Sequence, residues 1–528
     1  MTVTDRCCFR SLILPAVCGL LVLAGTGIGS WRMVAAAEPL PFLMADDFRD
    51  MELVAWRIEQ GRPDPANPLL EPEMPWDAGG VFSHGTVLKD PIDGRFKAWQ
   101  VSTPLSKRLG PGTWHHDRWL TYLESDDGVR WHRPKLGLIP WKGHPKTNLI
   151  MELWCAYASV NIDPKRAFPY EMFVFRYPGY PGASGRVKGL ALPKGADKHP
   201  YGLYRFRSKD GIGWEPTVGP IKLNTADSCF IYRQADGSYV SFHKTELPAF
   251  PGGVTPFDIA DGGVRLIGRR TSRDGLNWSD PTRLVMTPDW RDPGDTQFME
   301  LCPLKVPGGY VATLTVYHNH TQRIDLQWAA SRDGIRWWRP DRRAALPNPP
   351  LGEYGGGMIW PMRQPVPDGE RLHVYYSGNE SLHGDLFNTD RSGPRRLKAR
   401  GERLSRQSSS LPNFGALCRA SWRSGRLWAL APAIGGPYVG TATSVARELA
   451  DRQLLVNVVT RKSGMLRAEL LDGRGRVLEG FAAADCEPVR GDHQRMALRW
   501  RGGRRAPKSA SRVRFLLQRC FLYGFGVE

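Results

Sequence analysis

The sequence predicts an all-β chain, a five-bladed β-propeller followed by a C-terminal β-sandwich. Glycine (57) and proline (43) make up about 19% of the 528 residues, against a usual ~12%, and favour turns. The 19 Trp, 16 Tyr and 20 Phe favour strands. A hydrophobic content of 41% can bury at least one large core, which excludes disordered, collagen-like and coiled-coil chains. A short motif ending in Trp occurs four times, and this repeat is the third observation that predicts the fold class.

The first residues carry an export signal. Arg6 and Arg10 precede an uncharged apolar run, residues 11–30, and Ala35–Ala37 satisfy the small-residue rule for cleavage. We expect residues 1–37 to be a signal peptide and the protein to be secreted or periplasmic. The apolar run is long for a signal peptide, so an uncleaved N-terminal anchor is the alternative. That anchor is the only membrane contact that the sequence predicts.

The repeated motif is S-x-D-G-x-x-W, at residues 125–131, 208–214, 272–278 and 331–337. Its tryptophans are 83, 64 and 59 residues apart, which suits one propeller blade per copy. Asp and Gly form a tight turn in which the carboxylate accepts backbone N–H bonds, and the Trp packs back between neighbouring sheets. We therefore expect a structural role for the four aspartates of the motif: Asp127, Asp210, Asp274 and Asp333.

Strand-like segments precede the hairpins and set the domain boundaries. A fifth unit runs from Gly355 to Leu417 and closes with a degenerate hairpin at 424–428. The propeller is therefore predicted at residues 38–430. Residues 454–459, 466–471 and 513–517 alternate like strands without the motif, so residues 431–528 are predicted to form the β-sandwich.

The charge and the cysteines limit the partners. The net charge is +19, but only 17 of the 72 basic residues are lysines, and the arginines are scattered along the chain. A basic stretch at 395–406 is typical of a solvated loop, and no nucleic-acid-binding motif occurs, so we expect no nucleic acid partner. The six cysteines after residue 37 lack CxxC spacing, which leaves buried thiols and one or two disulfides open.

Polar residues near the starts of the innermost strands should converge at one mouth of a propeller channel. Glycoside hydrolysis needs two carboxyl groups, one as acid and one as base or nucleophile. The candidates are Asp163, Asp227, Asp295 and Glu300, although Asp163 could form a turn and Asp227 could cap a strand. Residues that could hydrogen-bond to or stack on a sugar are His84, His318, Glu353, Trp360, Glu380 and His383. No spacing matches a metal site, so neither a metal nor another cofactor is expected.

The four hairpins, Tyr375-Tyr376-Ser377-Gly378 and the following β-rich segment resemble the five-bladed propeller hydrolases of glycoside hydrolase families 43 and 32. The resemblance covers residues 45–528 and implies an exported enzyme that hydrolyses O-glycosyl bonds in a polysaccharide or oligosaccharide. The families place their acids on blades one, two and three. Here Arg291-Asp292-Pro293 and Glu300-Leu301-Cys302 both lie in blade four, so the family's acids do not transfer residue by residue.

Two other classes of function remain open. One is a non-catalytic glycan-binding propeller, which would explain why the acids of the families are not found on blades one, two and three. The other is an interaction module of the cell envelope, which an uncleaved N-terminal anchor would suit. Two carboxyl groups facing each other at about 5–10 Å would distinguish the hydrolase, because hydrolysis requires that separation.

Overall fold

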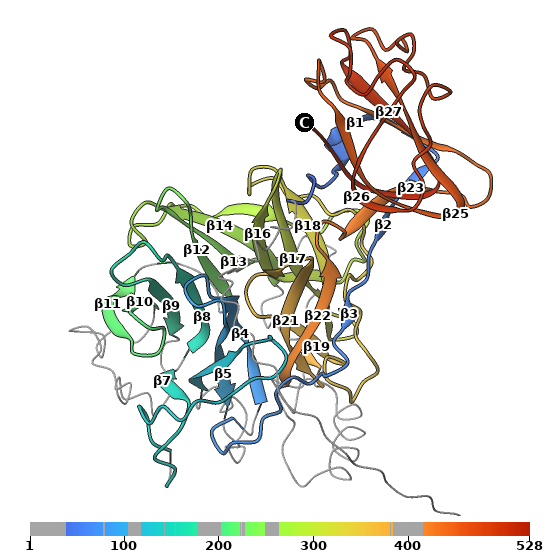
Figure 1. Ribbon diagram of the computed structural model, residues 1–528. Coiled ribbons are helices and arrows are strands. Elements are labelled where there is room, and N and C mark those ends of the chain that lie inside the picture. Colours follow the sequence, from blue (N-terminus) through green and yellow to red (C-terminus); the bar gives the residue numbers. More distant parts are fainter. Residues whose placement is uncertain are drawn as a thin grey trace, which may run out of the picture. The chain divides into compact units, whose positions relative to one another are not determined.

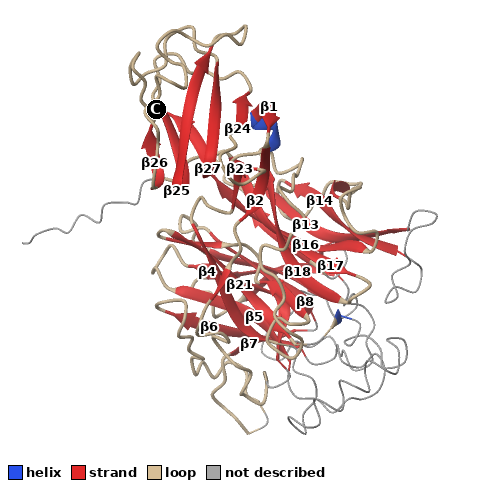
Figure 2. Ribbon diagram, turned by 90° about the vertical axis from the view of Figure 1, so that its right-hand side faces the viewer, coloured by secondary structure: helices blue, strands red, loops and turns tan. Residues whose placement is uncertain are grey.

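The computed structural model describes residues 38–528 except 78–79, 104–117, 142, 154, 177–201, 222, 224–227, 249–262, 381 and 384–414. The predicted signal, residues 1–37, and the basic stretch at 395–406 therefore lie outside the described residues. Regular structure in the described part is almost entirely β, with one short 3-10 helix, η1 (Ala45–Asp47) (Figure 2). The all-β prediction is confirmed. None of the described segments forms a helix with the length and apolar character that a membrane crossing requires.

Three four-stranded antiparallel sheets follow one another along the chain (Figure 1). The first contains β4 (Gly80–Lys89), β5 (Phe96–Thr103), β6 (Arg118–Ser125) and β7 (Leu149–Leu153). The second contains β8 (Cys155–Ile162), β9 (Tyr170–Arg176), β10 (Gly202–Ser208) and β11 (Glu215–Ile221). The third contains β12 (Cys229–Arg233), β13 (Tyr239–Pro248), β14 (Gly263–Ser272) and β15 (Arg283–Met286). In each sheet the strands pair in the order in which they occur in the sequence.

The fourth and fifth sheets are joined by a single parallel pairing, Ile324 with Met358. The fourth contains β16 (Thr296–Val306), β17 (Gly309–His318) and β18 (Arg323–Ser331). The fifth contains β19 (Met358–Pro361), β20 (Val366–Asp368), β21 (Arg371–Asn379), β22 (Ala416–Arg423) and β3 (Arg62–Pro63). Because β3 comes from the N-terminal part of the chain, the fifth sheet is completed by residues that precede the first.

The repeated hairpins have the local structure that the sequence predicts. In the first, Asp127 Oδ1 accepts N–H bonds from Val129 and Arg130, each at 2.8 Å, and Gly128 has φ +70°. The other three hairpins repeat these two bonds around Asp210, Asp274 and Asp333. The structural role expected for the four aspartates is confirmed.

Each hairpin also contacts the preceding sheet. Trp99 Nε1 of the first sheet donates to Gly211 O of the second hairpin at 2.7 Å, and Arg205 of the second donates to Asp274 O of the third at 3.0 Å. The rings of Phe242 in the third sheet and Trp337 in the fourth hairpin are 5.8 Å apart. Tyr375 of the fifth sheet donates to Gly128 O of the first hairpin at 2.9 Å. The contacts therefore also link the fifth sheet to the first.

A separate seven-stranded sheet combines both ends of the chain. It contains β1 (Phe48–Glu52), β2 (Val54–Ile58), β23 (Trp428–Pro432), β24 (Gly440–Ser444), β25 (Leu454–Leu471), β26 (Asp492–Ala497) and β27 (Arg512–Val527). The sequence predicts β1 and β2 in the propeller, whereas both pair with strands near the C-terminus. The strands form one continuous sheet with its own apolar core, including Leu430, Val456 and Phe515, and the predicted β-sandwich stays a prediction.

The described cysteines answer one open question. Cys229, Cys302, Cys418, Cys486 and Cys520 are buried and free, so no disulfide joins any of these five. Burial raises the pKa of the Cys418 and Cys520 thiols to about 12, which keeps them protonated and unreactive at neutral pH.

The hairpin aspartates predict how stability depends on pH. N–H bonds, first that of Arg130, lower the pKa of Asp127 to about 2, and bonds from Asn277 and Leu276 lower that of Asp274. Unfolding releases these bonds, so the unfolded chain binds more protons below its ordinary aspartate pKa of about 4. We expect the urea midpoint to fall as the pH decreases from about 4 to about 2.

An aspartate-to-asparagine pair tests this explanation. Asn keeps an oxygen that can accept the turn bonds but cannot ionise, so Asp127→Asn with Asp274→Asn should flatten the midpoint against pH over that range. An unchanged slope in the double variant would assign the acid sensitivity to other carboxylates.

Candidate functional site

A fully buried carboxylate, Glu300 on β16, organises the candidate site. The pairing of β16 with β17 shifts register between Phe298 and Glu300, and this β-bulge redirects the side chains that follow it. Glu300 Oε1 accepts from Ser228 Oγ at 3.0 Å and also contacts His84 Nδ1. Thr315 Oγ1 approaches Oε2 at 3.4 Å. A buried carboxylate needs such partners because water cannot solvate it.

His84 holds an unusual backbone conformation. Its φ is +75°, in the left-handed region that non-glycine residues seldom occupy, and it lies where β4 shifts register between Phe82 and Thr86. The next residue must be small, because a Cβ at Gly85 would lie 2.7 Å from Trp99 O. Non-glycine residues in strained conformations cluster at functional sites, where the surrounding structure enforces them. This strain and the contact with Glu300 make His84 a candidate functional residue.

Aromatic rings extend the site from His84. The rings of His84 and Trp360 are 5.1 Å apart in an edge contact, and those of Trp360 and His383 are 6.3 Å apart. Tyr317 lies against His383 with ring centroids 4.8 Å apart. Four of the ten predicted site residues, Glu300, His84, Trp360 and His383, are thus brought together from three sheets and the segment after β21. We call these four the central cluster.

Sequence reasoning missed a buried arginine near the central cluster. The Arg363 guanidinium donates to Asn161 Oδ1 at 2.6 Å, Ile231 O at 3.0 Å and Ser159 Oγ at 3.2 Å, and it lies 4.2 Å from the centre of the Tyr232 ring. It therefore ties the fifth sheet to the second and third. Burial lowers its pKa, and among the described residues only neutral oxygens accept its hydrogen bonds. Arg363 has a φ of +65°, and the sequence predicts neither this left-handed conformation nor that of His84.

The Arg363 side chain and Glu300 both affect the electrostatics of Cys302 and Tyr232. Burial raises the pKa of both groups well above the ordinary values, the Glu300 charge raises them further, and the Arg363 charge opposes that increase. Both groups are therefore neutral at physiological pH.

Asp295 and His318 form a second polar group, at the start of β16 and the end of β17. Asp295 Oδ2 accepts the His320 N–H at 2.7 Å, and His318 Nε2 lies 2.9 Å from Asp325 Oδ2. Burial lowers the pKa of His318, but the hydrogen bond and charge of Asp325 outweigh it and the net pKa is raised. Within the described residues, neither Asp295 nor His318 forms a hydrogen bond or an ion pair with Glu300.

The remaining predicted site residues lie elsewhere. Asp163 follows the end of β8, not its start, and pairs with Arg233 at 2.5 Å in a turn. Glu353 is exposed in a turn before β19. Glu380 follows β21, and together with burial and Glu71 it raises the pKa of Tyr354 to about 12. Asp227 lies outside the described residues, next to Ser228.

The described residues do not form a metal centre, because no group of three His, Cys, Asp or Glu side chains among them could hold an ion. What the central cluster offers is a carboxylate and an imidazole in contact, shielded from water. Such a pair can hold and exchange one proton, which is the basis of general acid–base chemistry. Within the described part, no second carboxylate contacts Glu300.

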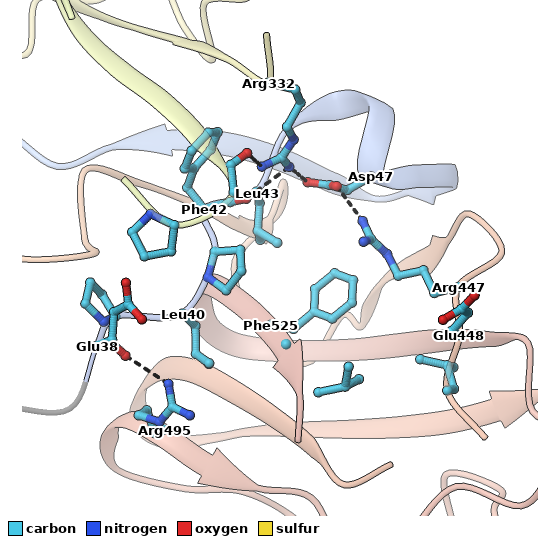
Figure 3. A pocket seen from close by; sticks show the side chains of 17 residues that line it. Glu38, Leu40, Phe42, Leu43, Asp47, Arg332, Arg447, Glu448, Arg495 and Phe525 are labelled. Carbon is cyan, nitrogen blue, oxygen red and sulfur yellow. Dashed lines mark hydrogen bonds and ion pairs between the residues drawn. The ribbon is translucent and has the colours of Figure 1, made fainter. Parts of the chain in front are cut away.

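A cavity of about 620 Å³ lies away from the central cluster (Figure 3). Asp47 bridges two arginines on its wall, Arg332 at 2.6 Å and Arg447 at 2.5 Å, and Arg332 also donates to Phe42 O at 3.2 Å. These bonds join the N-terminal segment to the fourth hairpin and to the C-terminal sheet. Since Asp47 pairs with both cations, the contacts serve to hold the segment in place.

Comparisons with known proteins give a distant likeness to carbohydrate-active enzymes. A thermostable family-43 glycoside hydrolase is 13% identical with a TM-score of 0.37, covering 57% of this chain and 84% of that one. A GH130 structure, from work on hydrolases of β-1,2 mannosidic linkages in Candida mannan, is 14% identical with a TM-score of 0.41, covering 73% and 97%. The β-1,2-mannobiose phosphorylase from Listeria innocua is 13% identical with a TM-score of 0.42, covering 69% and 96%. No protein-family model and no curated protein matches the chain.

Proposed function

We propose that the chain is an exported glycoside hydrolase with a five-bladed β-propeller and a C-terminal β-sandwich. Each repeated hairpin contacts the preceding sheet, and the first returns to the fifth, as blades around a channel would. The use of β3 to complete the fifth sheet is a common way to close such a ring, because it pairs the two ends of the propeller segment.

The proposed active centre is Glu300, with Asp227 as the second carboxyl group. The observation that carries the proposal is the contact of fully buried Glu300 with a left-handed His84. Hydrolysis needs one protonated and one ionised carboxyl, and His84 is placed to exchange a proton with Glu300. Asp227 immediately precedes Ser228, which donates to Glu300. The rings of Trp360 and His383 are buried beside this pair and hold His84 in place.

Activity profiling tests the proposal. A chain beginning at Glu38 would be incubated with plant and algal polysaccharides and aryl glycosides, and released reducing sugar measured. We expect at least one substrate to be cleaved, and cleavage to be lost when Asp227 or Glu300 becomes the corresponding amide. Cleavage that survives both substitutions would reject this pair of carboxyls. The mass of the protein recovered from the native host tests export, because cleavage after Ala37 leaves Glu38 at the N-terminus.

A glycan-binding protein without catalysis is the second candidate. One observation favours it: Asp292 and Glu300 lie just before and within β16, whereas the families that the sequence resembles spread their acids over three blades. A glycan array distinguishes the two functions. Binding to one class of glycan without cleavage of any member of the panel would establish the binding function and reject the hydrolase.

A further inference from the structure

A surface of the C-terminal sheet combines exposed aliphatic side chains with cations. Met51, Leu53, Ile434, Tyr438 and Val439 expose 40%, 45%, 49%, 55% and 40% of their surface. The segments that carry them are adjacent: the Ala433 N–H donates to Leu53 O at 2.8 Å, and β1 pairs with β24 from Phe48 to Glu52. Contiguous exposed apolar side chains rimmed by polar ones mark interaction sites. We call these five residues the apolar patch.

Leu53 is the least expected member of the apolar patch. It forms the turn between β1 and β2 with φ +52°, a conformation that glycine adopts without strain and leucine does not. Its side chain is exposed, so burial in the fold does not compensate for the strain. The fold of the described residues therefore gives no local reason for a leucine at this position.

Four cations lie around the register shift that β25 and β27 share, and one of them, Arg519, reaches the segment that carries Tyr438. Residues 461–464 bulge out of β25 between Thr460, opposite Cys520, and Met465, opposite Gln518. Arg490 donates to Gly464 O at 2.7 Å, and Arg519 donates to Gly436 O at 3.1 Å, beside Tyr438. The basic rim consists of these two residues with Arg461 and Lys462, all four exposed.

The charge of the basic rim is not neutralised within the described residues. None of its four cations forms an ion pair there, and the nearby Asp492 already binds Arg423 at 2.8 Å and Arg426 at 2.6 Å. Asp50 and Glu52, which flank Met51 on β1, are exposed as well. The whole segment is basic, with 17 Lys and Arg against nine Asp and Glu between residues 431 and 528.

We propose that the apolar patch and basic rim dock the protein onto an anionic phospholipid surface, a contact that the sequence does not predict. Aliphatic side chains at the level of the headgroups bury apolar area, and Lys and Arg beside them bind the phosphates. A glycan fits less well, because only Tyr438 offers an aromatic face for a sugar ring. The docking is independent of the enzymatic proposal.

Vesicle cosedimentation tests the docking. Residues 38–528, which hold all the sheets described above, would be mixed with vesicles of phosphatidylcholine alone or with one third phosphatidylglycerol; omitting residues 1–37 keeps the apolar run at 11–30 from entering lipid. We expect binding only to the anionic vesicles, weakening as salt increases. Neutralising Arg461, Lys462 and Arg490 to glutamine should weaken it by on the order of 100-fold, at about fivefold for each cation.

Two variants separate the patch from general charge and from misfolding. Leu53→Gly should weaken vesicle binding several-fold while the melting temperature stays the same or rises, because glycine suits φ +52°. Arg499, Arg504 and Arg505, exposed in the same sheet's final loop, form a matched charge control when changed to glutamine and should leave binding nearly intact. Equal losses in both triple variants, no vesicle binding, or binding to an acidic polysaccharide such as polygalacturonate instead would each overturn the proposal.

Discussion

Replacing Glu300 with glutamine is expected to lower the rate of glycosidic cleavage by about 10³-fold, the usual contribution of a general acid or base. Glutamine has nearly the same shape, so the chain should still fold. It cannot take up or release a proton as the proposed acid or base must, although its remaining oxygen can still accept the Ser228 hydrogen bond. Initial rates on the best substrate of the panel measure the effect, with circular dichroism to check folding.

Glu171→Gln is the matched control for this substitution. Glu171 is also buried, but it binds Arg166 at 3.2 Å and Arg205 on β10, and it contacts no member of the central cluster. Its loss should lower the unfolding midpoint, because Arg205 keeps a partly buried charge without its partner. The rate per folded molecule should be unchanged. Equal losses of rate in the two variants would mean that Glu300 matters only for folding.

Replacing Trp99 with alanine is expected to lower the free energy of unfolding by about 3–5 kcal/mol, the cost of emptying a large buried aromatic site. Trp99 is fully buried, its ring lies 5.8 Å from Tyr122 and 6.2 Å from Tyr170, and its Nε1 donates to Gly211 O in the next sheet's hairpin. The substitution therefore leaves a cavity and removes a bond between two sheets. Urea denaturation followed by fluorescence measures the change.

Trp290→Ala controls for the loss of a tryptophan as such. The Trp290 side chain is 90% exposed, so its truncation leaves no cavity and should change the free energy of unfolding by less than about 0.5 kcal/mol. Similar effects of the two substitutions would show that the first and second sheets do not depend on the Trp99 contact.

The sequence predicted those parts of the fold that depend on neighbouring residues. The hairpin motif can be predicted because all its bonds are local: Asp127 accepts the N–H groups of the two residues after Gly128, and Trp131 Nε1 donates to Gly128 O. The strands β1, β2 and β3 carry no such signal. They are short, and their partners β24, β23 and β22 lie at the other end of the sequence. Only the tertiary structure pairs them.

Prediction of the site was limited for a similar reason. The residue types of the central cluster, carboxylate, imidazole and aromatic ring, could be chosen from the sequence as those that bind or cleave sugars. Their contacts depend on the bulges before Glu300 and at His84, which alternation of polar and apolar residues does not reveal. The sequence also could not show that Asp163 follows the end of β8, or that Arg363 bonds to the second and third sheets. Both depend on how distant strands are placed.

The pairing of the two chain ends has a consequence for when the protein can fold. Synthesis produces β1 to β3 first, but their hydrogen-bonding partners emerge only after almost all the remaining residues. The last strand, β27, must also arrive before β23, β24 and β25 are held in one sheet. Such long-range pairing slows folding. Under the export proposed above, this delay would be useful, since a polypeptide that is not yet folded can still be threaded through a translocation channel.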